Sequence, residues 1–152
     1  MSEKPEALIE TLKKQDDILS ELLSITLKQR EALKDGRLSD LQDLMSEMRH
    51  TSVRAQAIEA KRSRAAAVIA NDLGCGATVS DILRAIPEEH SAAMDEAAKK
   101  LLSTVEKLKM EMSLLSRLMD EAKTLNEMMI TEWRKLGAQT AGLPMSGFDT
   151  RI

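Results

Sequence analysis

The sequence has few of the residues from which sheets, crosslinks and catalytic sites are built. Its 152 residues include no Tyr, one Phe, one Trp and one Cys, with only three Pro and six Gly. Scarce aromatic and β-branched residues disfavour a sheet, and rare Pro and Gly leave long stretches without a helix breaker. A lone Cys excludes an intrachain disulfide and fits a reducing compartment. We therefore predict an all-α protein of a single domain.

Long hydrophobic runs and a strong charge of one sign are also missing. The longest purely apolar run, AAAVIA at 65–70, is far shorter than the ~20 residues of a membrane span. The beginning, MSEKPEALIE, lacks the basic and apolar regions of a signal peptide. The net charge of −3 gives no reason to expect nucleic acid or an anionic membrane as partner. We expect a cytoplasmic protein without stable membrane insertion.

What the chain has in abundance is helix-forming residues, because Ala, Leu, Glu, Lys and Arg dominate its usage. The breaks at Gly36 and at LGCGAT (73–78) divide it into segments. The expected architecture is an elongated antiparallel bundle of three long helices and one short helix, with coiled-coil-like packing. The expected helices cover 5–34, 39–73, 80–86 and 87–136; the bundle domain is 1–137, and 138–152 is a flexible tail.

Two helix starts carry sequence signals. Ser39 and Gln42 have the Ser-x-x-Gln spacing of a capping box, which predicts the beginning of the second helix. Thr78, three residues before Asp81, is the expected start signal of the short helix.

The last helix has the clearest periodicity. Apolar residues alternate at spacings of four and three, which is a heptad repeat and predicts left-handed coiled-coil packing. Asn126 is the polar position in this seam, and we interpret it as a residue that sets the register. The seam comprises Leu101, Val105, Leu108, Met112, Leu115, Met119, Ala122, Asn126, Met129, Trp133 and Leu136.

No motif supplies the residues of a catalytic, cofactor or metal site. Glu47 and His50 have the Glu-x-x-His spacing of a di-iron ligand pair, but that architecture needs a second pair and two more carboxylates. Cys75 lies between two Gly without a His nearby in sequence, so it is interpreted as a loop thiol. We predict that the protein is not an enzyme, with no metal and no cofactor.

A basic stretch, KRSR at 61–64, lies in the second helix together with Arg49 and Arg54. Nucleic-acid binding would call for aromatic residues that stack on bases, and these are missing. We interpret the stretch as a solvated face that pairs with acidic neighbours.

The last helix is expected to extend, at its C-terminal end, beyond the first two helices. If the first two helices form a hairpin at Asp35-Gly36, an antiparallel last helix extends beyond the hairpin by about 6–12 residues, or roughly 9–18 Å. This end contains much of LNEMMITEWRKL (125–136). The apolar face is widest in this part of the helix, because Leu114, Leu118, Leu125 and Met128 flank the main seam. Met offers an adaptable contact surface and Trp a favoured interface anchor. The alternative is that the bundle closes differently and this face is ordinary core.

Three stretches and the short helix resemble the FlgN-type flagellar export chaperones. They are REALKDGRLSDLQDLMSE (30–47) in the hairpin, IEAKRSRA (58–65) and LMDEAKTLNEMM (118–129), with TVSDIL between two long helices. The resemblance implies a chaperone in flagellum biogenesis that binds the C-terminal segments of hook–filament junction proteins. It would deliver these clients to the type III export apparatus, with the export gate as a further partner.

The resemblance also assigns client binding to the last helix. The residues that it implies are Leu118, Leu125, Met128, Met129, Trp133 and Leu136. A competing hypothesis is a structural coiled-coil subunit that forms a homo-oligomer through the heptad seam, and a third is a helical metal-binding enzyme subunit.

Overall fold

The structure, a computed structural model, describes residues 3–139, and all their regular secondary structure is helical. The prediction of an all-α protein with three long helices and one short helix is therefore confirmed. The helices are α1 (Glu3–Lys34), α2 (Leu38–Leu73), α3 (Val79–Ala85) and α4 (Glu88–Gln139). The expected tail, 138–152, lies almost entirely outside the described residues.

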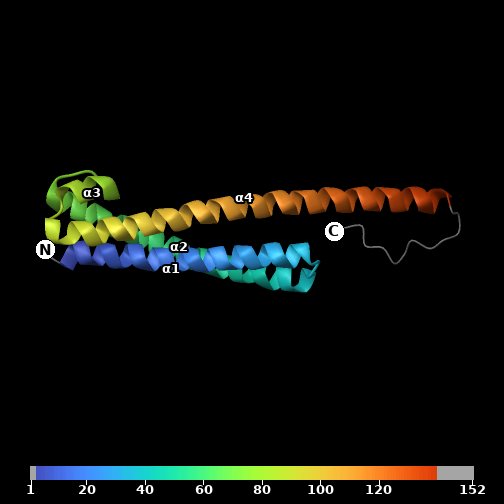
Figure 1. Cartoon of the computed structure of the whole chain (residues 1–152), viewed down its shortest axis with the longest axis horizontal. Coiled ribbons are helices and arrows are strands. Elements are labelled where there is room, and N and C mark those ends of the chain that lie inside the picture. Colours follow the sequence, from blue (N-terminus) through green and yellow to red (C-terminus); the bar gives the residue numbers. More distant parts are fainter. Residues whose placement is uncertain (1–2, 140–152) are drawn as a thin grey trace. The chain divides into compact units, whose positions relative to one another are not determined.

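The chain divides into two compact units. The first is Met1–Met112 and the second begins at Ser113, and α4 contributes residues to both. In the first unit α1 and α2 form a hairpin, with α3 at the end where α1 begins (Figure 1). The second unit is described as helix from Ser113 to Gln139.

The turn between α1 and α2 is a Schellman motif. Gly36 has a φ of +70°, a left-handed conformation that only glycine adopts without strain. The Arg37 N–H donates to the Ala32 carbonyl at 2.8 Å, and the Gly36 N–H donates to the Leu33 carbonyl at 3.2 Å. These two bonds satisfy carbonyls at the end of α1 and reverse the chain direction.

The prediction of a capping box at Ser39, at the start of α2, is wrong. The helix begins at Leu38, its N-cap is Arg37, and no side chain caps the free N–H groups, so Ser39 lies inside the first turn. The Schellman turn ends at Arg37, which leaves no room for a separate cap at Ser39. Asp40 places a negative charge near the positive end of the helix dipole instead.

The start signal of α3 is confirmed. The Asp81 N–H donates to the Thr78 Oγ1 at 3.1 Å, and Thr78 has the extended backbone of an N-cap.

The core of the first unit lies where α3 packs against the other helices. Leu8, Leu12, Ile82 and Met94 are at most 1% exposed and come from α1, α3 and α4. Burying each such side chain contributes about 1.5–3 kcal/mol. The cluster consists of Leu8, Ile9, Leu12, Ala66, Ile69, Ala70, Ile82, Ile86, Met94 and Ala97.

Polar contacts hold α1 against the first half of α4, at positions that the heptad seam did not include. The Thr104 hydroxyl donates to the buried Asp16 carboxylate at 2.5 Å. Arg30 donates to the Glu111 carboxylate at 2.6 Å. Met112, a seam residue, is 43% exposed. The buried side of α4 is therefore turned slightly away from the predicted seam, although Leu108 and Leu115 are buried as expected.

Candidate functional site

The end of α4 carries large apolar side chains that are exposed to solvent. Leu125, Met128 and Met129 are 59%, 61% and 53% exposed. Trp133 and Leu136 are also exposed, at 47% and 53%, and Leu118 is half-buried. These six residues are the ones that the sequence analysis singled out, and we call them the α4 apolar face.

The helix itself brings these residues together. Spacings of three and four place Leu125, Met129 and Trp133 along one side, and Leu136 continues the row. Leu118 precedes them on the same side and Met128 lies beside Met129. The result is a strip about five turns long, from Leu118 to Leu136.

The first half of the same helix provides a contrast. Met94 is fully buried and Ala97 and Leu108 are nearly so, whereas Met128 and Met129, of the same residue type, are more than half exposed. Monomeric proteins rarely expose apolar residues in contiguous groups of this kind, and such groups often mark binding sites. Along α4, Met94, Ala97 and Leu108 are therefore buried, whereas the α4 apolar face near the end of the helix is exposed.

Three polar side chains near the α4 apolar face have partners within the helix. The Thr131 hydroxyl donates to the Glu127 carbonyl at 2.9 Å, which allows a β-branched residue in the helix. Lys135 and Glu132 form an ion pair at 3.4 Å. Asn126, the polar residue of the seam, is half-buried. An apolar partner could therefore contact this surface without breaking the Thr131 hydrogen bond or the Lys135–Glu132 ion pair.

The other candidate residues are dispersed. Glu47 and His50 are both exposed on α2, and within 3–139 no group of three or more His, Cys, Asp and Glu side chains is arranged to hold a metal ion. Cys75 is half-buried and packs against the core cluster, and its N–H donates to the Ala70 carbonyl at 3.0 Å. The thiol is thus part of the packing and not a solvated loop residue, because the turn after α2 folds back onto the core.

Two arginines in or near the basic stretch of α2 form ion pairs with acidic neighbours. Arg62 contacts Glu59 at 2.6 Å, and Arg54 contacts Glu21 of α1 at 3.0 Å. The hydrogen bond from Arg62 lowers the pKa of Glu59, against the opposing effect of partial burial, and the hydrogen bond to Glu59 raises the pKa of Arg62. Gln15 of α1 also donates to Glu59. These residues join α1 to α2.

Sequence reasoning missed a groove on the α1–α2 hairpin. It has a volume of about 630 Å³, and its lining includes Leu23 and Leu27 of α1 and Leu44 of α2. These leucines were not assigned to any site in the sequence analysis, because periodicity within one helix does not show which residues of two helices line a common groove. The four-residue spacing of Leu23 and Leu27 within α1 was the sequence signal that could have indicated this apolar surface.

The molecule is thus an all-α protein whose long last helix carries an exposed apolar surface. No helix in the described part of the chain combines the length and apolar character that crossing a bilayer requires. The family model described as FlgN protein matches residues 1–139. The chain belongs to the FlgN family, a family of flagellar export chaperones. Neither curated proteins nor solved structures gave a match.

Proposed function

We propose that this chaperone binds the C-terminal segments of hook–filament junction proteins on the α4 apolar face, in the cytoplasm, and delivers them to the type III export apparatus. The observation that carries the proposal is the exposure of Leu125, Met128 and Met129 on a helix whose first half buries Met94. Membership of the FlgN family supports the class of client. The bundle, 1–137, is the binding part, and 138–152 is dispensable for folding.

The chemistry of the surface suits reversible binding. Covering the exposed parts of its apolar side chains gains less than the about 1.5–3 kcal/mol that fully burying each of them would give. Association and ordering cost about 4–15 kcal/mol. The remaining affinity is modest, as a chaperone that must release its client requires. Methionine side chains adjust to partners of different shape, which suits more than one client.

The experiment compares two methionines of the same helix. Met129→Glu places a charge on the α4 apolar face, where a bound client would desolvate it. Met110→Glu is the matched control, because Met110 is 72% exposed but lies outside that face. We expect Met129→Glu to weaken binding of a junction-protein C-terminal peptide by at least about tenfold, and Met110→Glu to leave it unchanged.

The circular dichroism spectrum and the melting temperature of both variants should match those of the unaltered chain. Trp133 is the only tryptophan, so its emission reports on this surface directly and should move to the blue when the peptide is added. Equal binding by the two variants would refute the proposal. A stable homo-oligomer that already covers the face and that Met129→Glu dissociates would favour the structural coiled-coil subunit instead.

A further inference from the structure

The groove on the α1–α2 hairpin has the form of a second binding site, in the first unit of the chain. Along α1 its lining runs from Ser20 to Glu31, and along α2 from Arg37 to Glu47. At 1.5 Å per residue, each wall is about 15 Å long, or three helical turns. Leu23, Leu27 and Leu44, all half-buried, provide apolar contacts in the groove.

Carboxylates dominate the charged lining of the groove. Four acidic residues line it, against the two cations Lys28 and Arg37. The four are Glu31, Asp40, Asp43 and Glu47.

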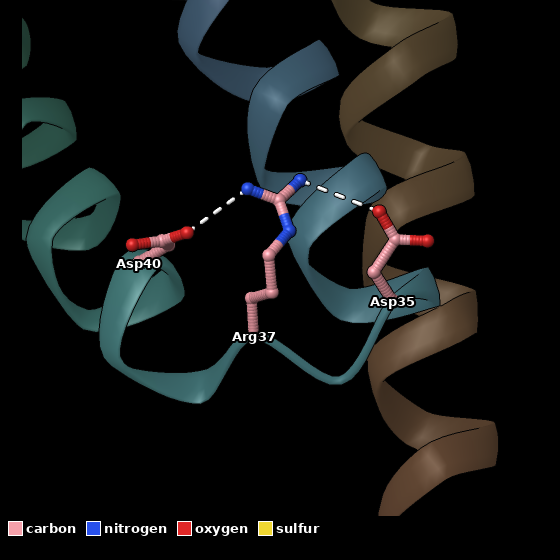
Figure 2. Close-up of polar contacts among 3 residues, drawn as sticks. All are labelled: Asp35, Arg37 and Asp40. Carbon is pink, nitrogen blue, oxygen red and sulfur yellow. Dashed lines mark hydrogen bonds and ion pairs between the residues drawn. The ribbon is translucent and has the colours of Figure 1, made fainter.

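One of the two cations is already neutralised. Arg37 donates to Asp40 at 2.9 Å and to Asp35 at 3.4 Å, so its guanidinium bridges two carboxylates at the turn (Figure 2). Within residues 3–139, no ion pair engages Glu31, Asp43, Glu47 or Lys28. The groove therefore combines apolar contacts with an excess of negative charge that has no partner inside this part of the molecule.

We propose that this groove binds a basic amphipathic helix of a partner protein. Apolar anchors at i, i+4 and i+7 of such a helix span about three turns, which is the length of the groove. Lys and Arg on the flanks of that helix would meet Glu31, Asp43 and Glu47. A second copy of this chain is a poorer occupant, because its net charge of −3 opposes approach to an acidic groove.

This site is separate from the α4 apolar face and does not depend on the client proposal. Its residues belong to α1 and α2, whereas the α4 apolar face begins at Leu118.

The test uses the full chain and a synthetic three-turn peptide with Leu at i, i+4 and i+7 and Lys on both flanks. Binding is followed by NMR of the labelled leucine methyl groups, and we expect the methyl signals of Leu23, Leu27 and Leu44 to shift. Affinity should fall as salt is raised, because exposed charges are screened. A peptide of the same composition with its leucines distributed around the helix, and one with Glu in place of Lys, should bind at least about tenfold more weakly.

Paired charge reversals test whether the acidic residues of the groove bind the basic peptide. Asp43→Lys with Glu47→Lys should reduce affinity for the basic peptide by at least about tenfold. The control, Glu10→Lys with Glu106→Lys, makes the same change in net charge at two exposed positions outside the groove and should change affinity less than about twofold. Melting temperature checks that both variants fold. Equal effects of the two reversals, unmoved groove methyls, or a dimer of the free chain that shifts those methyls would each overturn the proposal.

Discussion

Arg30 of α1 donates a hydrogen bond to Glu111 of α4 at 2.6 Å, with about a third or less of each side chain exposed. The two residues are 81 positions apart in the sequence. Together with the Thr104–Asp16 bond, this contact fixes the register of α1 against the first half of α4. A partly buried ion pair is screened less by water than one on the surface, so it contributes more to stability.

We expect Arg30→Gln and Glu111→Gln each to lower the free energy of unfolding by about 1–2 kcal/mol, between the values of exposed and buried pairs. A double-mutant cycle in urea should give a coupling of about 1 kcal/mol. The exposed pair Arg54–Glu21 is the control, with an expected coupling below about 0.5 kcal/mol. Equal coupling in the two cycles would show that the Arg30–Glu111 contact does not lock the helices.

Two methionines of α4 should respond in opposite ways to the same substitution. Met94→Ala removes a fully buried side chain and should cost about 2–5 kcal/mol of stability, because it leaves a cavity in the core. Met128→Ala, at a position 61% exposed, should change stability by less than about 0.5 kcal/mol. Met128→Ala should instead weaken binding of the client peptide. A large loss of stability from Met128→Ala would identify the end of α4 as core.

Gly36→Ala should destabilise the protein although there is ample space for the added methyl group. No atom lies within 4 Å of the position that a Cβ would occupy, but the φ of +70° is unfavourable for residues with a Cβ. The expected cost is about 1–2 kcal/mol, measured by urea unfolding. Gly36→Asn should cost less, since Asn adopts this conformation more readily. Full stability of the Ala variant would mean that the turn between α1 and α2 has changed.

Glu59 should make stability depend on pH in the acidic range. Its hydrogen bond from Arg62 lowers its pKa in the folded protein below the ordinary value of 4.5. The stabilisation is therefore fully present above the unfolded pKa and is lost as the pH falls through the folded pKa. The melting temperature of Glu59→Gln should lie below that of the unaltered chain at pH 7, and the difference should shrink below about pH 4.5. A difference that stayed constant down to pH 2 would contradict the assignment.

The positions of the four helices follow from signals that are local in the sequence. The chain reverses at Gly36 and α3 begins after Thr78 because these signals act on backbone groups within a few residues, where tertiary contacts are not needed. The same holds for the α4 apolar face, since three- and four-residue spacings place its members on one side of any helix. Ser39 failed as a cap because the preceding turn already supplied Arg37 as the N-cap.

Which side of each helix is covered, and by which residues, depends on contacts between the helices. Thr104 and Glu111 face α1 because Asp16 and Arg30, more than eighty residues earlier, offer them partners. Cys75 packs against the core because the turn after α2 folds back onto it. The groove exists because Leu23 and Leu27 meet Leu44 across the hairpin, in a register set by a single turn. Such contacts join residues that are distant in the chain, and periodicity within one helix carries no information about them.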